Sequence, residues 1–493
     1  MLLSDYAPAV GFGTSGLRAL VSNLTPEAVS AYARAFIRAT RSQGADVTGC
    51  VVGWDLRPSS QAIAAAVCAG LEAEGVEPEI AGPCPTPAIG LRAITAGKPG
   101  IVVTGSHIPF DRNGVKFFTA RGEITKADEH SLTACDALEL VISPDDLASA
   151  VSRWTKALAE PSGEAMGAYR ARFSDAFAAD CLSGLRIGVY QHSAVGRDFL
   201  LSLLRDLGAE VVALGRSESF VPIDTEAVLP EDETRAAAWA KEHGLDAIVS
   251  TDGDGDRPWV CDERGAFVRG DVLGVLAARR LGAQRVATPV SSNTALEKCE
   301  AFEKILRTRI GSPFVIEAME ALAEDEGVCV VGYEANGGFL TQTAAQVNGV
   351  SLSPLPTRDS TLPILLALTA AKESGAPVSA LVDSLPPRRT SSGSIKGIAT
   401  IDSFTFVLTM QSDPKSCDAF LSFTGSTQST VDSTDGLRVT MASGDIVHLR
   451  PSGNAPEFRC YVEADTQVRA DALLADALRA IAARFNVASP PAS

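Results

Sequence analysis

The stretch DAIVSTDGDGDRPWV (246–260) places three aspartates directly after a short apolar run. The run Asp246–Ser250 has the length and composition of a buried strand. Because α/β proteins place their ligands at the carboxyl ends of strands, Asp252, Asp254 and Asp256 are expected at a ligand site. The two intervening glycines allow the backbone to bend tightly between the carboxylates.

The spacing of these aspartates favours a metal site over a solvated acidic loop. Three carboxylates at alternate positions repel one another unless a cation holds them, and hard oxygen ligands select Mg²⁺ or Ca²⁺. An EF-hand is the competing metal site, but it needs a later glutamate and flanking helices. The residues RPWV (257–260) instead indicate that a strand resumes. We therefore expect Mg²⁺ or Ca²⁺ at this loop.

Outward from this loop, strand-like runs alternate with helical patterns. Further strands are predicted at Gly49–Gly53, Pro99–Thr104, Leu185–Tyr190 and Arg285–Pro289, and a helix at Ser59–Gly75. Such alternation implies parallel strands with helices on both faces of the sheet, and so an α/β fold class.

The character of the chain changes after about Pro386. The segments 436–441 and 445–450 flank Ala-Ser-Gly and predict a β-hairpin. The amphipathic pattern of Arg469–Phe485 predicts a closing helix. We expect a separate α+β domain here, with a linker at 386–389 and another boundary near 161–163. The 493 residues correspond to three or four domains.

Composition narrows the functional classes. Hydrophobic residues make up 46% and charged residues 21%, as is usual for a soluble globular protein. The net charge of −17 disfavours nucleic acid as a partner, but a few arginines could still bind a small phosphorylated substrate. No apolar run is long enough to span a membrane, and no secretory signal is evident. The 10 scattered cysteines indicate reduced thiols in the cytoplasm. The oligomeric state stays open.

Two further motifs carry groups capable of catalysis. In TGSHIP (104–109), Ser106 follows a predicted strand and is a candidate nucleophile or phosphate carrier, although taken alone a turn serine is the simpler interpretation. In NGVKFF (113–118), Lys116 lies on a predicted strand and could be a solvated lysine. A lysine near a dication and an arginine would have a lowered pKa and could serve as a general base.

Two turns resemble phosphate-binding loops. RPSGNAP (450–456) lies between two predicted strands, and its backbone amides, short polar side chains and Arg450 could form an anion nest. FGTSGLR (12–18) could make a similar contact, although it lacks the Gly-Lys-Ser/Thr ending of a P-loop. Either could also be an ordinary polar turn.

In this order, the motifs resemble those of the α-D-phosphohexomutase superfamily, which includes phosphomannomutases, phosphoglucomutases and phosphoglucosamine mutases. GYEANGG (332–338) completes the set, which spans nearly the whole chain. The resemblance implies three related α/β domains with mixed sheets and a C-terminal α+β domain like the TATA-binding protein, around a central cleft. The implied domains are 1–160 with the phosphoserine loop, 161–266 with the metal loop, 267–387 with the sugar loop and 388–493 with the phosphate loop.

The resemblance also implies roles for individual residues. Ser106 would carry the phosphoryl group and, with Asp252, Asp254 and Asp256, would hold Mg²⁺. Lys116 would be the general acid/base. The remaining implied residues are Arg18, His107 and Arg257 at the transfer site, Glu334 and Asn336 for the sugar, and Arg309, Arg450, Ser452, Gly453 and Asn454 for the distal phosphate.

The implied reaction interconverts hexose 1-phosphates and hexose 6-phosphates, most simply of mannose and also of glucose, through a hexose 1,6-bisphosphate that also serves as activator. Phosphoglucosamine mutase, a noncatalytic sugar-phosphate-binding protein and a metal-dependent phosphatase are the alternatives. The chain departs from common family patterns at Gly105 and Ile108 in the serine loop (usually TASHNP) and at Ala455 in the phosphate loop. In the sugar loop, Asn336 and Gly338 replace the Ser and His of several branches, which leaves the identity of the sugar open.

Overall fold

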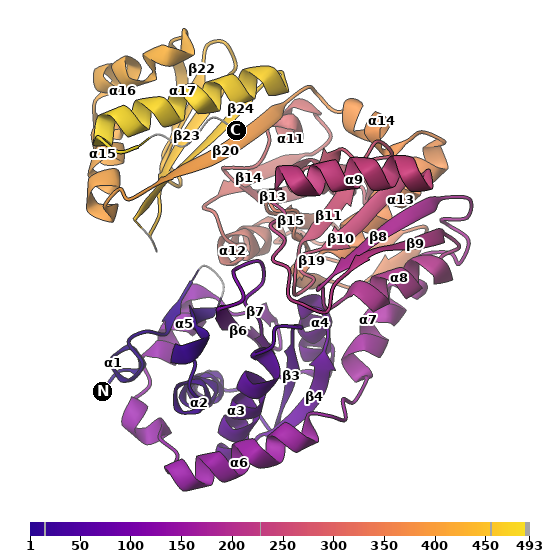
Figure 1. Ribbon diagram of the computed structural model, residues 1–493, viewed down its shortest axis with the longest axis vertical. Helices are drawn as coiled ribbons and strands as arrows, with labels where there is room; N and C mark the ends of the chain where they lie inside the picture. Colours follow the sequence, from indigo (N-terminus) through magenta and orange to yellow (C-terminus); the bar gives the residue numbers. More distant parts are fainter. Residues whose placement is uncertain (14–15, 227, 454–455, 489–493) are drawn as a thin grey trace. The chain divides into compact units, whose positions relative to one another are not determined.

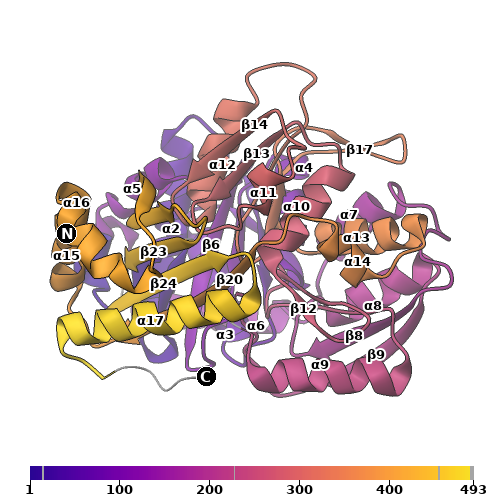
Figure 2. The same ribbon diagram turned by 90° about the horizontal axis from the view of Figure 1, so that it is seen from above.

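The chain folds into two compact units, each built from two segments. The computed structural model describes residues 1–488 except 14–15, 227 and 454–455. The first unit comprises Met1–Val286 and Gly311–Val382, and the second Ala287–Ile310 and Asp383–Ser493. Figures 1 and 2 show the elements of both units, which are described separately below.

The first sheet has strand order β1-β2-β6-β5-β3-β4, with β7 paired to β6. β3 is parallel to β4 and β5, whereas β6 is antiparallel to β5 and β2. Helices α2, α3 and α6 lie together on one face and α4 on the other, as right-handed crossovers require when the chain moves out to β4 and back to β5 (Figure 1). The bounds are β1 Gly11–Phe12, β2 Leu17–Leu20, β3 Gly49–Trp54, β4 Glu77–Pro83, β5 Gly100–Val103, β6 Arg112–Thr119, β7 Gly122–Glu123, α1 Leu3–Tyr6, α2 Pro26–Ser42, α3 Ser60–Ala73, α4 Thr86–Ala96, α5 Lys126–Thr133 and α6 Pro144–Ala157.

The second sheet carries the three aspartates. Its order is β12-β11-β10-β8-β9, in which β10, β8 and β9 run parallel and β11 turns back antiparallel to β10. In its core, Trp259 of β11 contacts Tyr190 of β8, and Tyr190 also contacts Trp239 of α9. The bounds are α7 Glu164–Ser174, β8 Arg186–His192, α8 Arg197–Asp206, β9 Glu210–Arg216, α9 Pro230–His243, β10 Ala247–Thr251, β11 Pro258–Cys261 and β12 Phe267–Val268.

The remaining strands of the first unit position the sugar loop. β15, β16 and β19 form an antiparallel arrangement, and β17 and β18 form a short hairpin. Helices α10 and α13 pack against each other, and most of their buried residues are Leu, Ile, Val and Ala. The bounds are α10 Gly270–Arg280, α12 Ser312–Leu322, β15 Val330–Tyr333, β16 Phe339–Thr341, β17 Ala345–Val347, β18 Val350–Leu352, β19 Leu355–Asp359 and α13 Thr361–Ser374.

The second unit contains an antiparallel sheet of order β20-β24-β23-β22-β21. Helix α17 lies along β20 and β24 (Figure 2). Helix α15 packs on the same core through Phe406, which contacts Phe458 and Phe485. The bounds are α11 Ala295–Lys298, β14 Lys304–Thr308, β20 Arg389–Lys396, α15 Thr400–Ser412, α16 Pro414–Phe420, β21 Gln428–Asp432, β22 Leu437–Met441, β23 Ile446–Pro451, β24 Glu457–Ala464 and α17 Gln467–Phe485.

The elements expected from the sequence are present. β3, β5, β8, β10 and β13 (Arg285–Pro289) match the predicted strands, and α3 starts after Ser59 as expected. The hairpin β22–β23 and the closing helix α17 are confirmed. The sheets of β3 and of β10 contain parallel strands, as the strand–helix alternation predicts, and also receive antiparallel strands through short hairpin returns such as β10–β11. This agrees with the expected mixed sheets.

Candidate active site

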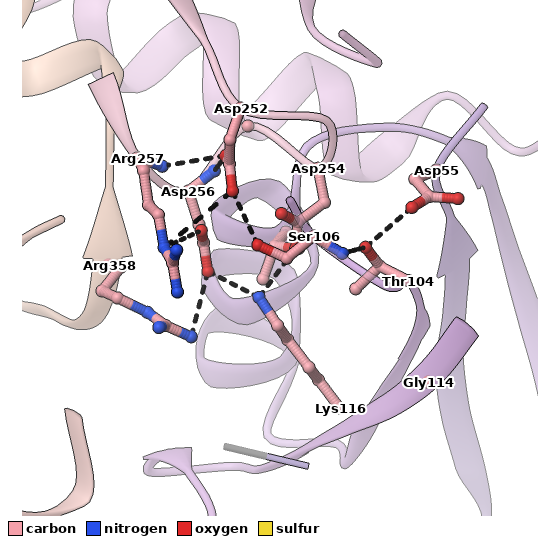
Figure 3. A network of polar contacts seen from close by, with 12 residues as sticks. Asp55, Thr104, Ser106, Gly114, Lys116, Asp252, Asp254, Asp256, Arg257 and Arg358 are labelled. Carbon is pink, nitrogen blue, oxygen red and sulfur yellow. Dashed lines mark hydrogen bonds and ion pairs between the residues drawn. The ribbon is translucent and has the colours of Figure 1, made fainter. Parts of the chain in front are cut away.

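The aspartate loop closes into a compact group of carboxylates. The chain leaves β10 at Thr251 and re-enters the sheet at Pro258, with Gly255 in the left-handed region at φ 73°. Asp252, Asp254 and Asp256 are fully buried, and their ligand oxygens lie within 4.8 Å of one another. Figure 3 shows the three carboxylates converging from this single loop. A strand that resumes as β11 excludes the helical flank of an EF-hand.

Ser106 lies directly against this group, although 146 residues separate it from Asp252. Its hydroxyl donates a hydrogen bond to Asp252 Oδ2 at 2.7 Å (Figure 3). The serine adopts a left-handed conformation at φ 54°, which is uncommon for a residue with a side chain. Its amide donates to Thr104 Oγ1 at 2.8 Å, and Thr104 in turn donates to Asp55 at 2.8 Å. Neighbouring contacts therefore hold the hydroxyl toward the carboxylates.

Arg57 holds the serine loop through its backbone carbonyls. Its side chain is fully buried and pairs with Asp55 at 3.2 Å. Its guanidinium donates to four backbone carbonyls at 2.6–2.9 Å, those of Ser106, Ile108, Pro109 and Arg112. The ring of Phe220 lies 4.1 Å from the guanidinium carbon. Since β3 and β5 are parallel neighbours, the turns after them meet at one sheet edge.

The same guanidinium explains the glycine in the serine loop. A Cβ at Gly105 would lie 2.6 Å from Arg57 Cζ and 2.8 Å from its Nε. Arg57 could not move away without breaking several hydrogen bonds. The family's more common alanine therefore does not fit the arrangement of this loop.

Lys116 extends from β6 to the aspartates. Its ammonium group donates to Asp254 Oδ2 at 2.7 Å and to Asp256 Oδ2 at 2.6 Å. Burial alone would lower the pKa of Lys116, but the two carboxylates outweigh it and raise the pKa above its ordinary value. The lowered pKa expected from the sequence was for a lysine beside a bound dication, and it stays a prediction for that state.

The three aspartates have different electrostatic environments. Burial and the repulsion from Asp254 and Asp256 raise the pKa of Asp252 well above its usual range. Burial would also raise the pKa of Asp254, but Lys116 and a 2.7 Å hydrogen bond from Thr86 hold it below that range. Among the described residues, Asp254 Oδ1 and Asp256 Oδ1 are buried without a hydrogen-bond donor. Two unsatisfied carboxylate oxygens beside Asp252 make a set of hard ligands that fits Mg²⁺.

Positive groups surround the serine. Arg257 Nη1 donates to His107 Nδ1 at 2.8 Å, so the ring proton of this histidine lies on Nε2. Burial together with Arg257 and Arg18 lowers the pKa of His107 to about 2, and the ring is neutral. Burial and the charges of Arg257 and Arg358 lower the pKa of Arg18 to about 10. The sequence-predicted residues His107, Arg18 and Arg257 thus share one electropositive region with Ser106.

The sugar loop follows β15. Asn336 Oδ1 accepts from the Gly338 amide at 3.0 Å, and the Gly338 carbonyl accepts from the Glu334 amide at 3.1 Å. Asn336 therefore shapes the loop from within. The Glu334 carboxylate lies 3.4 Å from Arg358 Nη1. A Cβ at Gly338 would lie only 2.7 Å from Arg358 Cγ, so there is no room for the histidine of other branches.

The expected distal-phosphate residues belong to the second unit. Arg450 Nε and the Ile310 amide both bind Asp435 Oδ2 at 2.9 Å, which draws the loop of Arg309 toward Arg450. Ser452 is buried, and its amide donates to the Glu457 carbonyl. Among the described residues, a side chain at Gly453 would meet nothing within 4 Å. Asn454 lies outside the described residues, and the relation of this group to Ser106 stays a prediction.

Comparison with known sequences gives the family. Residues 9–135, 169–265 and 269–388 match Phosphoglucomutase/phosphomannomutase, alpha/beta/alpha domains I, II and III, and residues 415–480 match the C-terminal domain of that family. The chain belongs to the phosphoglucomutase/phosphomannomutase family. Its enzyme class is therefore that of an intramolecular phosphotransferase, and its fourth domain is of the expected α+β kind.

Individual members of this family show how far the likeness extends. The chain is 42% identical to a phosphomannomutase of Salmonella muenchen over 93% of this chain and 92% of the relative. It is 44% identical to a phosphomannomutase of Sinorhizobium fredii over 95% and 98% of the two chains. The crystal structure of a Thermus thermophilus protein described as a putative phosphomannomutase shares the fold, with a TM-score of 0.72, 23% identity and coverage of 96% and 99%.

Several site residues of this family member escape sequence reasoning. Arg57, Thr86 and Arg358 contact the serine loop, the metal loop or the sugar loop but belong to no glycine-rich or carboxylate motif. Glu123 joins them through its ion pair with Arg358. The place of Arg57 in the site could have been inferred from the sequence, because Arg57 follows β3 at the sheet edge where Ser106 follows β5.

Among the described residues, no helix combines the length and apolar character needed to cross a membrane.

Proposed function

We propose that the chain interconverts mannose 1-phosphate and mannose 6-phosphate, and the corresponding glucose phosphates, through a phosphoserine at Ser106. The observation that carries this proposal is the 2.7 Å hydrogen bond from the Ser106 hydroxyl to Asp252, within a buried group of three carboxylates and Lys116. A serine held against ligands for a dication is arranged for phosphoryl transfer.

The cycle starts with phosphorylated Ser106. The bond from Ser106 Oγ to phosphorus breaks as a sugar hydroxyl forms the new bond, which yields a hexose 1,6-bisphosphate. The Lys116 ammonium donates a proton to the departing Ser106 oxygen, and the sugar hydroxyl returns one to Lys116. The Lys116 ammonium group is held beside the metal loop by hydrogen bonds of 2.7 Å to Asp254 and 2.6 Å to Asp256, a position that suits the donor role.

The second half of the cycle reverses these steps from the other end of the sugar. The bisphosphate turns over, and Ser106 accepts its other phosphate. Arg18, Arg257 and neutral His107 line the transfer position, while Glu334 and Asn336 belong to the sugar loop. Arg309, Arg450, Ser452, Gly453 and Asn454 are proposed to hold the phosphate that is not being transferred. Positioning and charge neutralisation supply most of the catalysis of phosphoryl transfer.

A magnesium ion held by Asp252, Asp254, Asp256 and a phosphoserine oxygen would neutralise charge on the transferring phosphoryl group. The two buried carboxylate oxygens that lack a donor among the described residues support this ligand set. A hexose 1,6-bisphosphate would also activate the enzyme by phosphorylating Ser106. The proposed division at residues 160, 266 and 387 places one loop of the site in each domain.

Mannose is favoured over glucosamine by the relatives. Two phosphomannomutases match at 42% and 44% identity over more than nine-tenths of the chain. A phosphoglucosamine mutase of Magnetococcus marinus matches at 32% over 63% of the chain. The cytoplasm is the proposed location, since all 10 cysteines are free thiols.

The test is isomerisation with defined substrates. The protein is incubated with Mg²⁺, a trace of glucose 1,6-bisphosphate and mannose 1-phosphate, glucose 1-phosphate or glucosamine 1-phosphate. We expect the 6-phosphates of mannose and glucose, detected by ³¹P NMR. Free sugar and inorganic phosphate would instead indicate a phosphatase, and no isomerisation of any substrate would contradict the proposal.

Mass spectrometry tests the phosphoryl carrier directly. After incubation with the bisphosphate, the intact protein should carry one phosphate that Ser106→Ala abolishes. Ser174→Ala is the matched control, because Ser174 is an exposed serine at the end of α7 and should leave the phosphate in place. A phosphate that survives Ser106→Ala would place the carrier at another residue.

A further inference from the structure

Arg358 lies at the meeting point of three segments of the first unit. It sits on β19, is 2% exposed, and reaches one carboxylate from each segment. Its Nη2 lies 3.0 Å from Asp256 of the metal loop, its Nη1 lies 3.4 Å from Glu334 of the sugar loop, and its Nε lies 3.6 Å from Glu123 at the end of β7. Figure 3 shows the guanidinium beside Asp256 on the side away from Ser106.

One end of this arrangement is fixed. Glu123 accepts hydrogen bonds from Ser312 at 2.7 Å and from Thr357 at 2.8 Å, so its carboxylate is held independently of Arg358. The residue two places after Arg358 also contacts the metal loop, because Ser360 Oγ donates to the Gly255 carbonyl at 2.7 Å. The backbone near Arg358 is therefore held by the Ser360 contact, and its guanidinium group is held by the fixed Glu123 carboxylate.

The Glu334 carboxylate has no comparable anchor of its own. Among the described residues, Arg358 is the hydrogen-bond donor to its side chain, and the Glu334 backbone is held by Gly337 and Gly338. A carboxylate that binds sugar hydroxyls must be held in one rotamer before the sugar arrives, or ordering it reduces affinity. The position of Glu334 thus depends on Arg358.

The sugar loop leaves room for this arginine. A Cβ at Gly338 would lie 2.7 Å from Cγ, 2.8 Å from Cδ and 3.1 Å from Cβ of Arg358. These atoms form the buried stem of the side chain, which cannot swing away without moving the guanidinium from Asp256 and Glu334. Glycine at 338 and arginine at 358 form one steric unit.

We propose that Arg358 is a positioning residue that fixes the Glu334 carboxylate for sugar binding and ties it to Asp256 of the metal loop. The proposal rests on the proposed function of this site. By joining both groups through one rigid guanidinium, Arg358 sets the sugar-binding carboxylate at a constant position relative to the phosphoryl-transfer loop. A sugar that binds in two orientations requires this constant reference.

The main test measures binding without turnover. Mannose 6-phosphate is titrated calorimetrically into the Ser106→Ala protein, with and without Arg358→Met or Arg358→Lys. We expect Arg358→Met to raise Kd at least tenfold and Arg358→Lys to give an intermediate value. Arg34→Met is the matched control: Arg34 on α2 is also buried and pairs with Glu74 at 2.8 Å, away from the sugar loop. Its Kd should stay within twofold.

A double-mutant cycle tests whether Arg358 acts through Glu334. Glu334→Gln should raise Kd by itself, and adding Arg358→Met to it should raise Kd less than twofold more. If the two substitutions raise Kd independently, so that their separate factors multiply in the double variant, the proposal is overturned. A control variant that raises Kd as much as Arg358→Met would overturn it too. Either result would reduce Arg358 to a structural role.

Gly338→Ala provides a test that leaves the arginine in the sequence. The added methyl group should displace Arg358 and raise Kd several-fold, whereas Gly167→Ala on α7, where a Cβ meets nothing within 4 Å, should not. An unchanged Kd for Gly338→Ala would contradict the claim that a side chain at residue 338 displaces Arg358. The two proposals can fail separately. If the effects of Arg358→Met and Glu334→Gln on Kd are coupled but the wild type isomerises no substrate, the proposed function is wrong and this inference stands. If the wild type isomerises its substrates but the two effects on Kd are independent, this inference is wrong and the proposed function stands.

Discussion

Replacing Arg57 by methionine should inactivate the site while leaving every predicted catalytic residue in the chain. Methionine keeps much of the buried volume but none of the donors. The carbonyls of Ser106, Ile108, Pro109 and Arg112 then lose hydrogen bonds of 2.6–2.9 Å, and Asp55 loses its ion pair. The serine loop is the segment that these bonds hold.

The expected magnitude follows from the buried part of this network. A hydrogen bond from a charged donor contributes about 1.5–3 kcal/mol, and we count only the one to Ser106, since the residues near Pro109 are open to water. The left-handed conformation of Ser106 costs about 1–3 kcal/mol. The hydrogen bond from Arg57 to the Ser106 carbonyl contributes a similar free energy, so it can offset this cost. Without it the loop relaxes, and a displacement of about 1 Å costs about 10²-fold in rate.

The assay is kcat for mannose 1-phosphate at saturating bisphosphate, together with the phosphoserine content from intact mass. Arg57→Met should lower kcat about 100-fold. Leaving Asp55 buried and unpaired should also destabilise the fold by about 3–5 kcal/mol. Arg34→Met is the control: Arg34 on α2 is nearly buried and pairs with Glu74 at 2.8 Å, away from the serine loop. The Arg34→Met protein should be less stable to unfolding, but its kcat, corrected for the folded fraction, should equal that of the wild type. A folded Arg57→Met protein with kcat within threefold of wild type would refute the reasoning.

Three further predictions concern the glycine, the metal and acid. Gly105→Ala should lower kcat with little change in KM, because the new Cβ would lie 2.6 Å from Arg57 Cζ. Gly167→Ala on α7, where a Cβ meets nothing within 4 Å, is the control and should leave kcat unchanged. Mg²⁺ at 100 times its Kd should stabilise the protein by about 2.7 kcal/mol in thermal unfolding, EDTA should abolish activity, and Asp256→Asn should remove most of the stabilisation. Burial lowers the pKa of His448 to about 4, below its unfolded value, so the unfolded chain gains a proton first as the pH falls. Stability should therefore decline between pH 6.5 and 4 by up to about 3 kcal/mol, less in His448→Gln, and a pH-independent wild type would contradict this.

The local pattern of the chain was enough to predict the strands and the main ligands. Asp252, Asp254 and Asp256 lie within five residues of one another directly after β10, so their convergence follows from one turn. The hairpin β22–β23 and the helix α17 likewise depend on residues that are near one another in sequence. The raised pKa of Lys116 was not predictable in this way, because it results from carboxylates 138 and 140 residues away.

The sequence by itself determined that this chain has an α/β architecture with a separate α+β domain, a carboxylate loop and a serine loop at strand ends, in the order of a phosphohexomutase. Only the tertiary structure decided that Ser106 meets Asp252, that Arg57 clamps the serine loop, and that Arg358 fills the space beside Gly338. The reason is physical: turns and periodicities report on neighbours a few residues apart. Which distant side chains share a buried site depends instead on which strand ends the folded sheets bring to one edge.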